Sequence, residues 1–282
     1  MPGLDICTVT LPSGAAMPAF GLGTWRMGED DRLRKVEVAA LRHGLALSVT
    51  LIDTAEMYGD GEAESIVADA IGPNRADIFI VSKVLPQNSS KRGTIAACER
   101  SLKRLKTDRI DLYLLHWRGS PPVAETVAAF EELIAAGKIR DWGVSNFDID
   151  DMRDLGKVDG AQKCATNQVL YNLSRRGIEF DLMPFCRDRR IPIMAYSPIE
   201  QGRILKHAGL QEVVRRHGVS AAQIALAWLM RQDGVITIPK ATTIEHVDDN
   251  LGALGLRLTA DDLALLDKHF PPPKRAAPLD ML

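Results

Sequence analysis

Three ionisable residues stand at the ends of short apolar stretches of the sequence. Asp53 follows Leu51 and Ile52, Lys83 follows the mainly apolar run 79–82, and His116 follows the apolar run 112–115. A charged group is costly to bury without a partner, so each of these residues needs one. For any one position taken alone, an Asp–Lys ion pair with a hydrogen-bonded histidine beside it is a sufficient structural interpretation.

A tyrosine is close enough in the sequence to join these residues. Tyr58 comes five residues after Asp53, in the loop that would follow the same apolar stretch. A lysine cation beside the phenol favours the phenolate and lowers the phenol's pKa toward neutrality, while the aspartate holds the lysine in place. A histidine at the same site can orient a carbonyl oxygen. These groups together suit the protonation of an oxygen while a hydride reaches the adjacent carbon.

The segments that carry these residues belong to a regular alternation. Runs rich in Ile, Val and Leu alternate with segments of helical spacing, such as 63–71, 93–105 and 123–136. This pattern indicates parallel strands that helices cover on both faces, and eight units in about 250 residues fit a (β/α)8 TIM barrel of the α/β class. The expected strands are 20–24, 50–54, 78–84, 110–116, 139–144, 164–169, 191–197 and 235–239.

Segments outside the eight units predict additional elements. Residues 6–11 and 15–18 flank a Pro-Ser-Gly turn and predict an N-terminal β-hairpin that caps the bottom of the barrel. Residues 205–217 and 260–269 predict two extra helices, followed by an extended tail. Because no linker, composition break or internal repeat divides the chain, we expect a single domain over residues 1–282.

The composition excludes several classes of partner. The 282 residues include 35 Lys or Arg and 37 Asp or Glu, which gives a formal net charge of −2. Because positive and negative residues are interspersed, the sequence predicts no binding to nucleic acid or to a membrane surface. The longest apolar runs are too short to span a bilayer, and residues 1–5 do not resemble a signal peptide, so a cytoplasmic location is expected. The four cysteines form no Cys-x-x-Cys pair and are interpreted as buried apolar residues.

Polar or aromatic side chains mark the end of every expected strand. In a (β/α)8 barrel the site lies at the C-terminal ends of the strands, so these side chains are expected to converge at one mouth. They are Thr24-Trp25, Asp53, Lys83, His116-Trp117, Ser145-Asn146, Gln168, Tyr196-Ser197 and Lys240.

The motifs around these strand ends resemble those of the aldo-keto reductase family over nearly the whole chain. They are Gly21-Leu22-Gly23-Thr24-Trp25, Ile52-Asp53-Thr54-Ala55-Glu56-Met57-Tyr58-Gly59, Val81-Ser82-Lys83, Asp111-Leu112-Tyr113-Leu114-Leu115-His116-Trp117, Gly137-Lys138-Ile139-Arg140, Gly143-Val144-Ser145-Asn146-Phe147, Asn167-Gln168, Tyr196-Ser197-Pro198 and Ile238-Pro239-Lys240. Each motif is modest evidence alone, but their order and spacing are specific. The resemblance implies a (β/α)8 barrel with a bottom hairpin and two extra helices, similar to bacterial methylglyoxal and aldehyde reductases.

The resemblance also implies an activity and roles for four residues. The expected reaction is the NADPH-dependent reduction of small aldehydes or ketones to alcohols. Tyr58 is expected to be the general acid, Lys83 and Asp53 to tune it, and His116 to position the carbonyl. The family binds its nicotinamide cofactor without a Rossmann domain, and segment 21–26 accordingly lacks the last glycine of the Gly-x-Gly-x-x-Gly pattern.

The cofactor contacts implied by the resemblance come from several strand ends. Ser145, Asn146 and Gln168 are expected to hold the nicotinamide carboxamide, Tyr196 to stack on its ring, and Lys240 to meet the adenosine 2′-phosphate. The other expected contacts are Gly23, Thr24, Trp25, Asp53, Ser197, Pro198, Ile199, Gln201, Gly202, Ile238, Ala241, Thr242, Thr243, His246, Asp249 and Asn250.

Two positions depart from the commonest pattern of the family at the adenosine end. Ala241 stands where many members have Ser, and His246 stands where an Arg is usual. The loss of a hydroxyl donor and of a guanidinium fork should weaken the contact with the 2′-phosphate. NADPH is the expected cofactor because Lys240 is kept, and NADH is the alternative.

The expected substrate pocket has apolar walls. Trp25, Met57 and Trp117 are expected to surround the carbonyl beside Tyr58 and His116. The tail after the last expected helix is short, which predicts an open pocket and a broad range of small substrates, such as methylglyoxal-like dicarbonyls and short aldoses.

Two other classes of function compete with a reductase. A cofactor-sensing regulatory subunit is one alternative, because channel-associated relatives share the barrel and the four residues, although no long loop suggests a docking partner. A metal-dependent hydrolase or isomerase would need clustered carboxylates or histidines, which Asp53 and His116 alone do not supply, so no metal is expected. The resemblance further implies a monomer.

Overall fold

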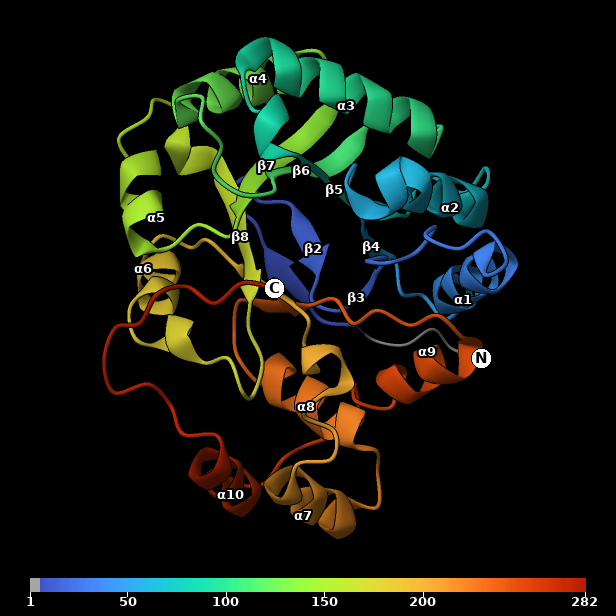
Figure 1. Cartoon of the computed structure of the whole chain (residues 1–282), viewed down its shortest axis with the longest axis vertical. Helices are drawn as coiled ribbons and strands as arrows, with labels where there is room; N and C mark the ends of the chain where they lie inside the picture. The colour runs from blue at the N-terminus through green and yellow to red at the C-terminus, as the bar shows by residue number, and fades with distance from the viewer. Residues whose placement is uncertain (1–5) are drawn as a thin grey trace.

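Eight parallel strands form a barrel at the centre of the molecule in the computed structural model, which describes residues 6–282 (Figure 1). The strands are β3 (Gly21–Gly23), β4 (Leu51–Asp53), β5 (Phe79–Val84), β6 (Ile110–Leu115), β7 (Ile139–Ser145), β8 (Cys164–Leu170), β9 (Ile193–Tyr196) and β10 (Val235–Thr237). Each strand pairs with the next, and parallel bridges from Phe20 to Thr237 and from Gly23 to Lys240 join the last strand to the first. The predicted (β/α)8 fold is confirmed, with every strand within two residues of its expected ends.

The closure between the first and last strands depends on a glycine. A Cβ at Gly23 would lie 2.6 Å from the backbone oxygen of Ile238, closer than real Cβ atoms approach an oxygen. Only glycine therefore allows the two strands to approach this closely beside the mouth of the barrel.

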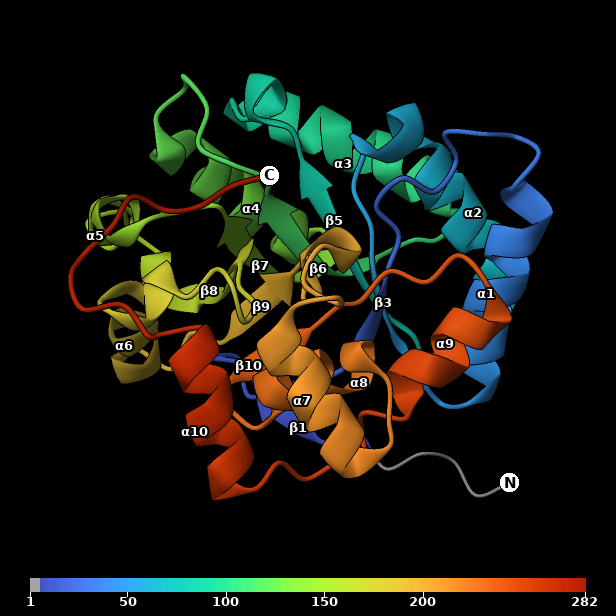
Figure 2. The ribbon, with the colours of Figure 1, turned by 60° about the horizontal axis from the view of Figure 1, so that its bottom comes forward.

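Helices cover the outside of the barrel. They are α1 (Arg34–Ala46), α2 (Glu62–Ile71), α3 (Lys91–Leu105), α4 (Val123–Ala135), α5 (Ile149–Leu155), α6 (Leu182–Asp188), α7 (Ala208–His217), α8 (Ala221–Met230), α9 (Ile244–Leu251) and α10 (Ala260–His269). The two predicted extra helices are α7 and α10, which pack side by side outside the ring of barrel helices (Figures 1 and 2). The ring centroids of His207 and His269 lie 5.6 Å apart at this contact.

Two apolar clusters stabilise the barrel. The larger lies between the strands and the helices, and the smaller fills the interior of the barrel. The hairpin of β1 (Thr8–Thr10) and β2 (Ala16–Pro18) lies at the bottom, and Leu11 and Met17 pack into the interior cluster. The predicted bottom hairpin is therefore confirmed, and it leaves the opposite end of the barrel open for a site.

Some expectations need correction or remain predictions. Three cysteines are buried as expected, but Cys7 is exposed because it lies just before the hairpin rather than in the core. The single-domain prediction for residues 1–282 and the absence of a signal peptide both involve residues 1–5, which lie outside the described residues. Both stay predictions.

Candidate active site

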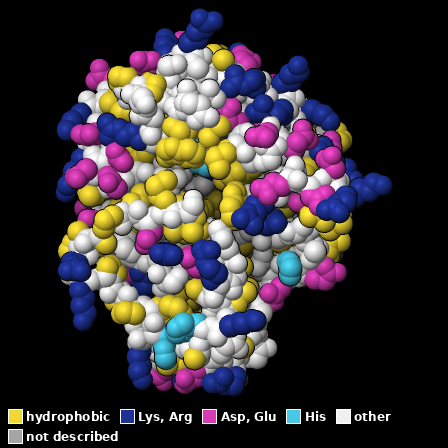
Figure 3. All heavy atoms as spheres, in the orientation of Figure 1, with side chains coloured by type: hydrophobic (Ala, Val, Ile, Leu, Met, Phe, Trp, Pro, Cys, Tyr) yellow, Lys and Arg dark blue, Asp and Glu magenta, His cyan; other side chains and the backbone are white. Residues whose placement is uncertain are grey.

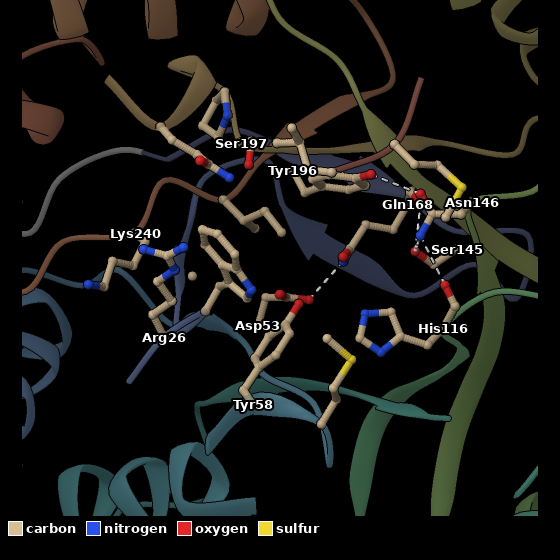
Figure 4. Close-up of a pocket in the computed structure, with 18 of the residues that line it drawn as sticks. Arg26, Asp53, Tyr58, His116, Ser145, Asn146, Gln168, Tyr196, Ser197 and Lys240 are labelled. Atoms are coloured by element: carbon tan, nitrogen blue, oxygen red, sulfur yellow. Dashed lines mark hydrogen bonds between the residues drawn. The ribbon is translucent and has the colours of Figure 1, made fainter. Parts of the chain in front are cut away.

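The C-terminal ends of the strands surround a cavity of about 530 Å³. Apolar side chains gather around this hollow over the middle of the barrel (Figure 3), and the polar residues converge inside it (Figure 4). The expected substrate residues that line it are Trp25, Met57, Tyr58, His116 and Trp117. The expected cofactor residues that line it are Gly23, Trp25, Asp53, Ser145, Asn146, Gln168, Tyr196, Ser197, Pro198, Ile199, Gln201, Gly202, Ile238 and Lys240.

Seven expected cofactor residues lie outside the lining of the cavity. They are Thr24, Ala241, Thr242, Thr243, His246, Asp249 and Asn250. The hydroxyl of Thr24 donates to the backbone oxygen of Asp53 over 3.0 Å, inside the barrel wall. The hydroxyl of Thr243 caps α9, and the carboxylate of Asp249 accepts a hydrogen bond of 2.9 Å from Ser220. In the described structure these polar groups therefore stabilise local elements.

Lys83 lies at the centre of a buried hydrogen-bond network. Its ammonium donates to Asp53 Oδ2 over 2.9 Å, to the backbone oxygen of Thr54 over 2.9 Å and to Tyr58 Oη over 3.1 Å. The exposed fractions of the Lys83 and Asp53 side chains are 0% and 3%. All three N–H bonds of the ammonium are used, so the lysine is held in one orientation.

Tyr58 is held with its oxygen against this lysine. The tyrosine begins a short 3-10 turn after β4, and its phenol oxygen accepts a hydrogen bond from Lys83, which leaves the phenol proton free to donate elsewhere. Burial raises the pKa of Tyr58 above its ordinary value, and the opposing effect of the Lys83 cation does not reverse this. The expected net lowering of this pKa was wrong, because desolvation outweighs the charge of the lysine. The phenol is thus held in its protonated form.

His116 packs beside Tyr58 in the wall of the cavity. Its ring centroid lies 5.7 Å from that of Tyr58 in an edge-to-face arrangement and 4.9 Å from that of Trp117. Burial, with the nearby Lys83 cation adding to the effect, lowers the pKa of His116 to about 2. The imidazole is therefore neutral at physiological pH and can act only as a neutral hydrogen-bonding group.

The amide side chains opposite Tyr58 form a second network. Tyr196 Oη donates to Asn146 Oδ1 over 2.9 Å, and Asn146 Nδ2 donates to the backbone oxygen of His116 over 3.0 Å. Asn146 adopts a left-handed conformation directly after β7, which Asn tolerates better than most residues. Gln168 Nε2 donates to Asp53 Oδ1 over 2.7 Å (Figure 4). Because Asp53 also binds Lys83, this bond connects this side of the cavity to the lysine.

Two cations lie together at the far end of the cavity. Figure 4 shows Arg26 beside Lys240, and Arg26 also stacks over Trp25, with its Cζ 4.5 Å from the ring centroid. Burial lowers the pKa of Lys240, and the neighbouring Arg26 contributes to this. The sequence interpretation missed Arg26, although its position directly after the first strand end was an available signal.

The C-terminal tail crosses the barrel mouth, contrary to the expectation that it would leave the pocket open. After α10 the chain has no regular secondary structure, and Met281 and Leu282 line the cavity (Figure 1). Arg175 pairs with Asp280 of the tail at 3.2 Å and with Glu200 of the loop after β9 at 3.1 Å. No local pattern in the sequence indicated that these distant segments would meet.

The described residues contain neither a metal-binding cluster nor a helix that could span a membrane. Within residues 6–282, no group of three or more His, Cys, Asp or Glu side chains is placed to hold a metal ion. None of the helices described is long and apolar enough to cross a membrane.

Comparisons with known proteins give consistent results. A model of the aldo/keto reductase family matches residues 19–270. The chain is 54% identical over 272 residues to the methylglyoxal reductase YeaE of Escherichia coli, with 95% of this chain and 96% of that protein covered. It is 35% identical over 260 residues to the glyoxal reductase of Bacillus subtilis, with 92% and 91% covered.

The fold agrees with a solved structure as well. An aldo-keto reductase from Klebsiella pneumoniae, solved in complex with NADPH, superposes with a TM-score of 0.95 at 48% identity, covering 99% of this chain and all of that one. The family match, the close relatives and the site geometry lead to one conclusion. The chain belongs to the aldo/keto reductase family.

Proposed function

We propose that this protein reduces small aldehydes and ketones to alcohols with NADPH, and that Tyr58 donates the proton. The observation that carries the proposal is the saturated Lys83 ammonium. Its three hydrogen bonds hold the oxygen of a protonated phenol at the edge of the cavity. A phenol fixed in this way is suited to protonate a carbonyl oxygen that lies in the cavity.

The residues present fit a nicotinamide dinucleotide. Gln168 and the residues of the loop after β9, including Ser197 and Gln201, line the cavity. Arg26 and Lys240 place two cations at one end, where phosphate groups would be bound. When bound, the cofactor supplies the hydride. The NADPH and NADP complexes of the Klebsiella relatives support the same cofactor here.

The chemistry of the chain's own residues follows from their positions. His116 and Tyr58 both line the cavity with their rings 5.7 Å apart, so both can reach the oxygen of a carbonyl bound there. As the carbonyl carbon gains a hydride, the electron pair of the C=O π bond moves to the oxygen, and this oxygen takes the proton of Tyr58. The cation of Lys83 then stabilises the negative charge left on the phenol oxygen. Asp53 keeps the lysine in place throughout, and the neutral His116 orients the oxygen.

The lining of the cavity favours neutral substrates. The walls near Tyr58 come from Trp25, Met57, Trp117 and the two tail residues 281 and 282. Among the described lining residues, the charged side chains are Asp53 in the buried network and the two cations at the cofactor end. The methylglyoxal and glyoxal reductases among the relatives support small dicarbonyls as substrates.

The decisive experiment follows NADPH absorbance with methylglyoxal and glyceraldehyde for the native protein and for Tyr58→Phe. We expect turnover to fall by about 10²- to 10⁴-fold in the variant, because the proton donor is lost. Binding of NADPH, measured by fluorescence titration, should be retained. A native protein that binds NADPH but reduces none of a panel of aldehydes would instead support a cofactor-sensing role.

We further propose a monomer located in the cytoplasm. The family resemblance supports this proposal. Light scattering coupled to size-exclusion chromatography tests the first part, and fractionation of cells that produce the protein tests the second. A dimer peak at micromolar concentration would contradict the monomer.

A further inference from the structure

Gln168 lies where the cofactor side of the cavity meets the buried ion pair. Its Nε2 donates to Asp53 Oδ1 over 2.7 Å and lies 2.7 Å from Met194 Sδ. Both of these partners are acceptors, which assigns the amide nitrogen to the interior and Oε1 to the cavity. Among the described residues, no donor is paired with that Oε1. The nitrogen of this amide therefore faces the buried ion pair, and its oxygen faces the cavity.

A continuous chain of hydrogen bonds runs from this amide to Tyr58. Gln168 binds one oxygen of Asp53, the other oxygen binds Lys83 over 2.9 Å, and Lys83 binds Tyr58 over 3.1 Å. Asp53 and Lys83 come from the adjacent strands β4 and β5, and Gln168 comes from β8 on another side of the barrel. These three side chains and that of Tyr58 are all buried. Since the lysine has no spare N–H and each Asp53 oxygen has its own partner, a shift of one member must move the next.

We propose that Gln168 is a positioning residue that fixes Asp53, and through it Lys83 and Tyr58, so that the cavity-facing amide and the proton donor are mechanically linked. The amide N–H holds the carboxylate in the orientation that directs Oδ2 at the lysine. Without it, the carboxylate is free to rotate and to draw the ammonium away from the phenol. This inference rests on the proposed function.

The charges of the chain agree with this role. Burial raises the pKa of Tyr58, the Lys83 cation lowers it, and the Asp53 anion raises it. An N–H group directed at the Asp53 carboxylate takes up part of that negative charge. Loss of the hydrogen bond therefore makes the phenol a weaker acid as well as a less well-placed one.

The variant Gln168→Glu separates this role from cofactor binding. Glutamate keeps an acceptor for the cavity but replaces the N–H with an oxygen. When protonated, it can still donate to Asp53; when ionised, it cannot, and it repels the aspartate. We expect kcat of this variant to fall by about tenfold or more as pH rises, along a limb that the native enzyme lacks, while the Kd for NADPH changes much less.

A second readout uses the protein without cofactor or substrate. Ultraviolet difference titration reports the ionisation of Tyr58 when the variant Tyr58→Phe, which lacks this phenol, serves as the reference. The titration is limited to the pH range in which circular dichroism shows an intact fold. Gln168→Glu should shift this ionisation upward. If this variant does not fold, Gln168→Met replaces it and should show a lower kcat at every pH, together with the same upward shift.

The matched control is Met194→Leu, which removes the sulfur acceptor of the same amide but keeps its bond to Asp53. It should retain the native pH profile. The proposal is overturned if Gln168→Glu keeps the native profile of kcat and only weakens NADPH binding, or if Met194→Leu reproduces the new limb. If the native protein does not reduce methylglyoxal, the proposed function fails, whereas the tyrosine titration still tests the link.

Discussion

Lys83 Nζ lies 2.9 Å from Asp53 Oδ2, and neither side chain is accessible to solvent beyond a few per cent of its surface. Two opposite charges in the wall of a barrel stabilise each other only as a pair, because each is costly to bury alone. The same pair holds the oxygen of Tyr58 in position. The pair therefore affects both the stability of the fold and the activity, and removing both partners should restore part of the stability but not the activity.

Removal of one partner should be worse for stability than removal of both. Lys83→Met leaves the Asp53 carboxylate buried without its cation, and we expect the free energy of unfolding to fall by about 3–5 kcal/mol. The double variant Lys83→Met/Asp53→Asn should recover part of that loss, while activity stays lost in both. Urea unfolding of the three proteins measures this. Equal unfolding free energies for the single and double variants would contradict the pairing argument.

The neutral His116 predicts a specific pH profile. Because burial lowers the pKa of His116 to about 2, the residue stays deprotonated through the physiological range. The plot of kcat/KM against pH should therefore have no inflection from this residue between about pH 5 and 8. His116→Asn should lower kcat/KM by about 10²-fold without removing any inflection from the profile. A limb near neutral pH that disappears in this variant would show that the histidine titrates there.

Lys240 should set the preference for the phosphorylated cofactor. Its ammonium donates to Thr242 Oγ1 over 2.6 Å at the end of the cavity that also holds Arg26. We expect Lys240→Met to weaken NADPH binding by about 10- to 100-fold, in line with a charge-assisted hydrogen bond, and to change NADH binding little. Fluorescence titration with both cofactors measures this, with the exposed Lys157→Met as the control. Equal Kd values of the native protein for NADPH and NADH would contradict the preference.

Arg175 should couple the loop that binds the cofactor to the C-terminal tail that lines the substrate end of the cavity. One end of its guanidinium pairs with Asp280, next to the two tail residues that line the cavity, and the other end pairs with Glu200, in the loop expected to hold the cofactor. Arg175→Met should therefore raise both the KM for methylglyoxal and the Kd for NADPH, with kcat nearly unchanged. Steady-state kinetics and fluorescence titration give the three values.

The control for this prediction is Arg153→Met. The side chain of Arg153 is exposed and pairs with Asp150 one turn away on α5, so its loss should change neither constant. If Arg175→Met raises the KM but leaves the Kd for NADPH at its native value, the tail and the loop are not coupled through this arginine.

The sequence by itself determined the barrel and the central residues of the site. Apolar runs at regular intervals predict parallel strands, because strands covered on both faces must be apolar throughout. Against that background Asp53, Lys83 and His116 are conspicuous, and parallel strands bring their C-terminal ends to one mouth. These three residues meet Tyr58 as expected, whereas seven of the expected cofactor residues lie outside the lining of the cavity.

Only the tertiary structure decided how that site is tuned and enclosed. The direction of the Tyr58 pKa depends on how completely the phenol is desolvated, which is a property of packing rather than of neighbouring residue types. The bond from Gln168 to Asp53 and the placement of Met281 join segments that are far apart in the chain. Local patterns report which face of an element is apolar, but long-range contacts arise only when the barrel closes.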